Sequence, residues 1–326
     1  MSTDPIRWVD GMQSGHYSRA QFEALAAGRL AAATITVGVW EDFPEAVDAV
    51  IAWRRMIERN HDLVTVVRSA TELSWAEADG RVGLLLGFQN SNFVGDRLDR
   101  LEAFYDLGVR VVQLTYNNAT HAASGCYEST DGGLTRFGAN LVAELNRLGM
   151  LVDVSHVGDR SSAETIDASA APVAFTHANA RDLYDHPRNK PTWLLRALAE
   201  RGGVVGCTLY PNLIGPVHSA SLSSWCAMVA RTAELVGVEH VAIGSDLGGC
   251  YDTDQMNRLR SGYWTHQVDP GAAIAGAPDL AEPTWLPDLS HATALQEGLA
   301  ACGFGDADLA LIMRDNWLDL YAKVLG

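Results

Sequence analysis

Two neighbouring runs, LVDVSHVG at residues 151–158 and PVAFTHANA at residues 172–180, each lead from apolar residues to a histidine. Side chains alternate between the two faces of a strand. If both runs are extended, His156 and His177 continue a row of apolar side chains at the C-terminal end of their strands. Two imidazoles on consecutive strands indicate half of a metal site. Satisfied core histidines are the alternative, but the matching positions favour a shared role.

Extended apolar runs and helical patterns alternate along the whole chain. Helical patterns separate nearly all of the extended runs, and no glycine-rich phosphate fingerprint follows the first run. Eight such units in 326 residues favour a closed (β/α)8 barrel of the TIM type over an open doubly wound sheet. The extended runs are expected at 7–10, 34–40, 82–89, 109–116, 151–156, 172–177, 204–210 and 240–246.

Length and composition indicate one globular domain over residues 1–326, with 48% hydrophobic and 20% charged residues. Residues 248–289 are rich in Gly, Pro and Trp without a clear period, so we expect a loop there that acts as a lid. The formal net charge of −16 argues against nucleic acid and anionic membrane surfaces as partners. We expect neither a signal peptide nor a membrane span, and the five widely spaced cysteines fit reduced thiols in a cytoplasmic protein.

Strand C-termini converge on one mouth of a barrel, so polar residues that end these runs are candidates for a site. Asp246 ends the last run, and the following Gly248-Gly249 favours a tight loop over a helix cap. Arg188 could be a solvated loop charge or could clamp a substrate carboxylate. Cys126 and Glu128 have no partner base in the pattern and are assigned to structure.

Five stretches together carry a family resemblance that covers nearly the whole chain: GLTRFGANLVAELNRLGMLVDVSHVG (133–158), PVAFTHANA (172–180), Arg188-Asn189, AIGSDLGG (242–249) and RDNW (314–317). In these stretches the chain resembles the membrane (renal) dipeptidase family of zinc metallopeptidases, peptidase family M19. The resemblance implies a metal-dependent hydrolase barrel, usually dimeric, whose two-zinc site hydrolyses dipeptides at the C-terminal mouth.

The resemblance also implies roles for individual residues. His156 and His177 match the histidine ligands of one zinc ion. Asp246 matches the aspartate that contacts metal and attacking water and takes the proton of that water. Arg188 matches the arginine that holds the substrate carboxylate.

Four positions depart from the family pattern. The family has Asp-Gly-His-x-Asp after the first strand, whereas residues 10–14 read Asp-Gly-Met-Gln-Ser, so Met12 and Ser14 replace two zinc ligands. Gln89 stands where the family has a glutamate that bridges the two metals. Tyr116 stands where many members have a histidine that contacts substrate, and we assign Tyr116 and Gln89 to substrate binding.

Electrostatics decides what these replacements imply. Two divalent ions about 3.5 Å apart repel by roughly 19 kcal/mol at an effective dielectric constant near 20, and anionic ligands normally offset that. Asp246 is the one metal-contacting carboxylate of the motif that remains. We therefore expect at most one zinc ion, bound at His156 and His177. A site without any metal ion is the alternative.

The sequence leaves three functions open. The first is a dipeptidase-like hydrolase, a homodimer acting on a dipeptide or another small amino-acid-derived amide that carries a carboxylate. The second is a metal-free enzyme of changed chemistry, with Tyr116, His156 and Asp246 as acid–base groups. The third is a catalytically silent barrel that binds a small anionic molecule.

Overall fold

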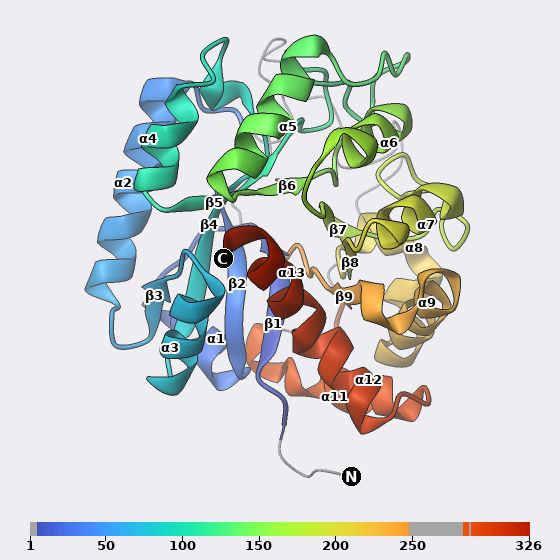
Figure 1. Ribbon diagram of the computed structural model, residues 1–326. Coiled ribbons are helices and arrows are strands. Elements are labelled where there is room, and N and C mark those ends of the chain that lie inside the picture. Colours follow the sequence, from blue (N-terminus) through green and yellow to red (C-terminus); the bar gives the residue numbers. More distant parts are fainter. Residues whose placement is uncertain (1–4, 248–282, 287) are drawn as a thin grey trace.

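A parallel sheet curls into a barrel and forms the centre of the molecule (Figure 1). The computed structural model describes residues 5–247, 283–286 and 288–326. The strands follow one another in the order β1-β2-β4-β5-β6-β7-β8-β9, and β3 pairs with β4 outside this path. They are β1 (Trp8–Gln13), β2 (Leu30–Gly38), β3 (Val64–Val66), β4 (Val82–Phe88), β5 (Val109–Gln113), β6 (Leu151–Asp153), β7 (Ala174–Ala178), β8 (Val204–Cys207) and β9 (Val241–Ile243).

The barrel closes between its first and last strands. Ser14 and Asp246 donate backbone hydrogen bonds to the carbonyl oxygens of Leu247 and Met12, at 3.3 and 2.9 Å. The side chain of Asp10 adds two more bonds, because it accepts from the backbone N–H and the hydroxyl of Ser245 at 2.7 and 2.5 Å. The predicted (β/α)8 barrel of the TIM type is confirmed.

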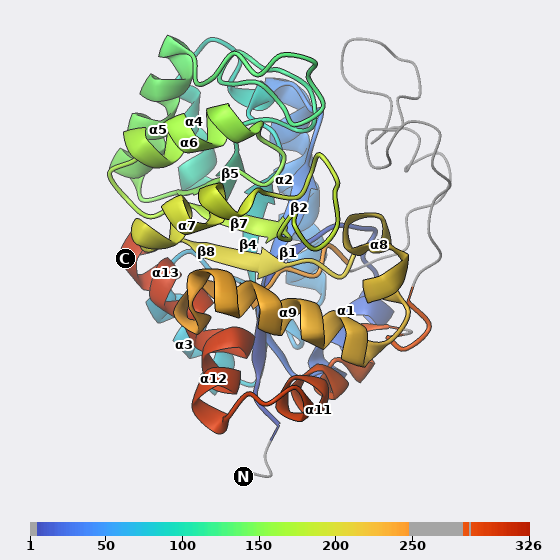
Figure 2. The ribbon, with the colours of Figure 1, turned by 90° about the vertical axis from the view of Figure 1, so that its right-hand side faces the viewer.

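Helices surround the sheet (Figure 2), and a proline and a glycine mark the ends of two of them. Pro44 lies in the first turn of α2, and Gly149 ends α5 at φ 71°. No helix within the described ranges is long and apolar enough to cross a membrane. The α-helices are α1 (Arg19–Ala27), α2 (Phe43–Arg59), α3 (Ala70–Ala78), α4 (Arg100–Asp106), α5 (Arg136–Leu148), α6 (Asp159–Ala168), α7 (Thr192–Glu200), α8 (Pro211–Ser219), α9 (Leu222–Val236), α11 (Thr293–Ala301), α12 (Asp306–Ala310) and α13 (Asn316–Leu325).

The C-terminal helix covers the bottom of the barrel, where α13 crosses the centre of Figure 1. Trp317 is fully buried there and donates its indole N–H to the carbonyl oxygen of Ile243 at 2.8 Å. A Cβ atom at Gly11 would collide with the Trp317 ring. The barrel floor therefore needs both the large ring of Trp317 and a residue without a side chain at position 11.

Several predicted boundaries were wrong. The extended run expected to reach residue 156 ends at Asp153, so His156 lies in the turn after β6 rather than on a strand face. Asp153 ends the strand because its carboxylate accepts the backbone N–H of Ser155 at 2.9 Å and turns the chain. The spacing of Leu309, Met313, Leu320 and Val324 predicts one helix over 307–324. In the structure, a π-helical turn at Leu311–Asp315 divides this helix. The predicted lid at 248–289 lies almost wholly outside the described residues.

Candidate active site at the barrel mouth

Two buried histidines meet at the C-terminal end of the barrel. His156 follows β6 and His177 lies within β7, and their exposed fractions are 5% and 0%. Their Nε2 atoms lie 2.9 Å apart. The predicted pair is therefore brought together, with the two rings tilted against each other at an interplanar angle of 55°.

Each imidazole is held by an oxygen on its other nitrogen. The Nδ1 atom of His156 lies 2.7 Å from the amide oxygen of Asn117, which can only accept. The Nδ1 atom of His177 lies 2.8 Å from the Thr176 hydroxyl, whose own hydrogen goes to the Asp153 carboxylate at 2.6 Å. Both Nδ1 atoms are therefore the protonated nitrogens, and both Nε2 atoms carry lone pairs.

Two facing lone pairs repel each other unless a cation lies between them or beside them. Zinc–nitrogen bonds are about 2.0–2.1 Å long, so two histidine ligands of one ion lie roughly 3 Å apart. The donor set at His156 and His177 fits one such ion, and the oxygen partners on Nδ1 are what metal-ligating histidines need. Within the described ranges, no group of three or more His, Cys, Asp or Glu side chains could hold a metal ion.

Two cations lie close to the histidines. Arg188 is 2% exposed, and its guanidinium donates to the backbone oxygens of Ser155 and, at 3.2 Å, His177. Lys190 is fully buried and donates to the carbonyl oxygen of Val157 at 2.5 Å. No ion pair among residues 5–247, 283–286 and 288–326 involves either cation.

These charges and their burial set the protonation of the site. Burial first, and then the charge of Arg188, lowers the pKa of His156 and of His177 well below the usual value. Burial also lowers the pKa of Lys190 to about 8. Both imidazoles are therefore neutral at neutral pH, in a region of positive potential that attracts an anion.

The opposite side of the mouth carries neutral residues. Thr36 joins two of them, because its hydroxyl accepts from the Gln89 amide at 2.7 Å and lies 3.4 Å from the Met12 sulfur. The Gln89 amide oxygen is buried and has no hydrogen-bond partner in the part of the chain that the structure describes. A thioether and an amide supply no charge to offset a second divalent ion, so this half of the site does not fit one.

Asp246 lies at the seam between the first and last strands. It is half-buried and has a φ of 59°, in the left-handed region that aspartate tolerates better than most residues. Beside it, Asp10 is fully buried, and desolvation raises the pKa of its carboxyl to about 6 despite its bonds to Ser245. Asp10 holds the seam together, and Asp246 remains the candidate for the proton-accepting group.

Tyr116 connects the histidines to an aromatic wall. Its ring stacks on His156 at 4.2 Å between centroids and meets the edge of Trp40 at 5.3 Å. Trp40 had no place in the sequence-based site, because an isolated tryptophan after a strand carries no specific signal. Asn117 was missed too, although its place directly after Tyr116 at the end of a predicted strand was a usable clue.

Comparison with known proteins identifies a consistent set of relatives. The model of the family described as membrane dipeptidase (peptidase family M19) matches residues 8–259. An uncharacterized dipeptidase of Schizosaccharomyces pombe is 32% identical over 212 residues, which are 63% of this chain and 51% of that protein. Dipeptidase 3 of Rattus norvegicus is 29% identical over 285 residues, which are 86% of this chain and 52% of that protein. The chain thus spans about half the length of these relatives.

Solved structures show the same architecture. An amidohydrolase from Pseudomonas aeruginosa superposes with a TM-score of 0.92 at 32% identity, over 98% of this chain and 96% of that one. A metallopeptidase from Rhodobacter sphaeroides, liganded with a phosphinate mimic of the dipeptide L-Ala-D-Ala, superposes with a TM-score of 0.80 at 20% identity. That alignment covers 98% of this chain and 100% of the metallopeptidase, and at this identity it speaks for the fold alone.

Proposed function

Because the chain belongs to the membrane dipeptidase family, peptidase family M19, we propose that it is a hydrolase with an altered site that holds at most one metal ion. Its substrate is a dipeptide or another small amide derived from an amino acid. The proposal rests on one observation, the facing Nε2 atoms of His156 and His177 at 2.9 Å. Such a pair is a ligand set for one cation, whereas Ser14 and Gln89 stand where the family has the carboxylates that a second ion would need.

A single zinc ion held by His156 and His177 would polarise the substrate carbonyl or activate a water molecule. The chain's own residues prepare for this. Asn117 and Thr176 fix both imidazoles with their Nε2 lone pairs toward the mouth. Ordinary dipeptides should turn over slowly, because the two-metal clamp is missing.

The positive potential at the histidines selects the substrate. Arg188 and Lys190 are two buried cations without a carboxylate partner among the described residues, and the substrate's carboxylate would supply the missing negative charge. Arg188 also donates to the carbonyl oxygens of Ser155 and His177, so the same guanidinium positions the histidine-bearing segments. We infer that a carboxylate-bearing substrate lies with its acidic end toward Arg188.

Three further side chains have roles in this proposal. A carboxylate oxygen of Asp246 takes the proton of the attacking water and returns it to the leaving nitrogen. The ring of Tyr116 packs against the substrate beside His156. Gln89 provides an amide that stays neutral at every pH, and its buried oxygen accepts a hydrogen bond from the substrate or from a water molecule.

The test combines metal analysis of the purified protein with a screen of dipeptides and N-acyl amino acids, with and without added zinc. We expect no more than one zinc ion per chain and a turnover that a chelator abolishes and that His156→Ala removes. Two tightly bound zinc ions with rapid hydrolysis of common dipeptides would contradict the altered site. Turnover that resists chelation would favour the metal-free enzyme, and binding without turnover would favour the silent barrel.

A further inference from the structure

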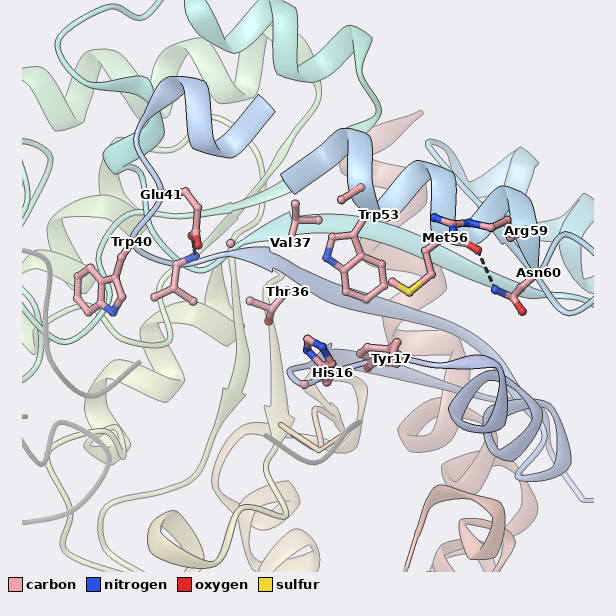
Figure 3. A pocket seen from close by; sticks show the side chains of 14 residues that line it. His16, Tyr17, Thr36, Val37, Trp40, Glu41, Trp53, Met56, Arg59 and Asn60 are labelled. Atoms are coloured by element: carbon pink, nitrogen blue, oxygen red, sulfur yellow. Dashed lines mark hydrogen bonds between the residues drawn. The ribbon is translucent and has the colours of Figure 1, made fainter. Parts of the chain in front are cut away.

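A cavity of about 660 Å³ lies beside the mouth, between the loop that follows β1, the end of β2 and the helix α2 (Figure 3). Its walls are largely apolar, and three of the side chains are large and almost completely buried. Tyr17, Trp40 and Trp53 are 8%, 7% and 9% exposed, and the rings of Tyr17 and Trp53 contact each other at 5.1 Å between centroids. Cavities of this size and lining bind small organic groups.

Two charged side chains of the lining bond to backbone groups of their own segments. The Glu41 carboxylate accepts the backbone N–H of Val39 at 2.5 Å, so it caps its own loop. Arg59 is exposed at the far end of α2 and donates to the carbonyl oxygen of Arg55 at 3.1 Å. Val37, Trp53 and Met56 offer an apolar surface to a ligand, and the His16 imidazole lies across from them (Figure 3).

Two contacts connect the cavity to the barrel mouth. Trp40 lines the cavity and meets Tyr116, which stacks on His156. Thr36 also lines the cavity and bonds to Gln89. The inner end of the cavity is thus formed by residues that touch the catalytic mouth.

The position of the cavity in the barrel indicates how a substrate would be oriented in the mouth. β2 stands second and β7 sixth in the order of the eight barrel strands, so they lie on opposite sides of the barrel. Arg188 and Lys190 lie on the β7 side, and the cavity opens on the β2 side. A molecule that crosses the mouth would have its acidic end at the cations and its other end at the cavity.

We propose that this cavity binds a bulky apolar group on the acyl side of the substrate's amide, either an aromatic ring or an alkyl chain. The substrate class is then an N-acyl amino acid, or a dipeptide with a large apolar amino-terminal residue, rather than a dipeptide of small residues. This inference rests on the proposed function for the identity of the scissile amide. Its physical basis is independent of turnover, because burial of an apolar group in an apolar cavity is a binding effect.

Two probes that cannot be hydrolysed test the proposal by calorimetry. N-(benzylsulfonyl)glycine and N-(methylsulfonyl)glycine share a carboxylate and an N–H group but differ in the size of the apolar end. We expect the benzyl probe to bind about 10- to 50-fold more tightly, in proportion to the additional apolar area buried. Equal affinities, or no measurable binding of the benzyl probe, would overturn the proposal.

A pair of variants shows whether the preference comes from this cavity. Ala52 lines it and is exposed on α2, so Ala52→Phe fills space without changing the core. We expect the benzyl-over-methyl preference to fall below about threefold in this variant. Ala143→Phe on the exposed side of α5 is the matched control and should keep the preference. A preference that survives Ala52→Phe in a folded protein would place the apolar group elsewhere.

The outcome is separable from that of the proposed function. If the benzyl preference and its loss in Ala52→Phe are observed but no amide is hydrolysed, the cavity assignment stands and the hydrolase fails. If small dipeptides and bulky N-acyl amino acids are hydrolysed equally well and the probes bind equally, the hydrolase stands and the cavity assignment fails.

Discussion

The Nε2 atoms of His156 and His177 lie 2.9 Å apart, and neither carries a hydrogen, because an oxygen acceptor holds the proton of each ring on Nδ1. This relationship distinguishes the pair from two core histidines that bond to each other, where one Nε2 would donate. Their low pKa values keep both rings neutral at neutral pH. Two facing lone pairs would accept one cation between them, which is the basis of the proposed single-metal site.

Asn117 should control metal affinity without touching the metal. Asn117→Gly removes the acceptor for the His156 Nδ1–H and tolerates the φ of 62° at this position. We expect zinc affinity to fall about 10- to 100-fold, as for other partners of metal-ligating histidines. Competition with a chromophoric chelator measures this, with Asn118→Gly as control. Equal affinities of both variants and the parent protein would show that the Asn117 contact is dispensable.

The second metal position should be recoverable. Met12→His, Ser14→Asp and Gln89→Glu together restore the family's ligand types and add two carboxylates against the repulsion between two ions. We expect the zinc content of this triple variant to rise to two ions per chain, whereas Gln89→Glu alone should not raise it. A folded triple variant that still binds one ion or none would mean that the surrounding loops, and not the ligand types, prevent the second site.

Asp246 should act on the chemical step. Asp246→Asn keeps the shape of the side chain and the backbone conformation but cannot accept a proton. We expect kcat to fall about 10²- to 10⁴-fold with the best substrate of the screen, a typical contribution of a general base. Steady-state kinetics measure this, and substrate KM should change little. A variant with nearly full kcat would exclude Asp246 as the proton acceptor.

His186 should make the fold sensitive to mild acid. Burial lowers the pKa of His186 from 6.5 to about 4, so the unfolded chain binds the proton first as the pH falls. The free energy of unfolding should therefore decrease by roughly 2 kcal/mol between pH 7 and pH 5 through this residue. Urea unfolding at both pH values, compared between the parent and His186→Gln, isolates the effect. The raised pKa of Asp10 acts in the opposite direction but is common to both proteins.

Trp317 should be one of the most sensitive positions for stability. Trp317→Ala removes a fully buried ring and its hydrogen bond to Ile243, and we expect the free energy of unfolding to fall by about 3–5 kcal/mol. Trp193 is 55% exposed on α7 and provides the matched control, for which we expect less than about 1 kcal/mol. Similar losses in the two variants would argue against the role of Trp317 in the barrel floor.

Much of the barrel follows from local sequence signals. Ser18 and Gly28 bound α1, and the apolar pattern of residues 222–236, followed by Gly237, predicts the whole of α9. Caps and a 3.6-residue period act over a few neighbours. Strand ends were less predictable. The turn after β6 depends on a bond between Asp153 and Ser155 that an apolar pattern does not encode.

Some residues of the candidate site could likewise be predicted from the sequence, and others could not. His156 and His177 could be found from the sequence because they end two similar runs. Lys190 and Trp40 could not, since their importance comes from burial and from contacts between distant segments. The cavity between α2 and the loop after β1 depends on packing between side chains from three elements, which no period in the sequence reports.

The position of Trp317 has a consequence for how the chain acquires its structure during synthesis. The ring that fills the barrel floor belongs to α13, whereas Gly11, which makes room for it, lies in β1. A ribosome that has translated the first 300 residues has released all of the barrel strands but not yet the side chain that packs beneath them. The apolar surface at the bottom of the barrel therefore stays exposed until α13 emerges. During this interval the nascent chain offers chaperones its largest apolar binding surface.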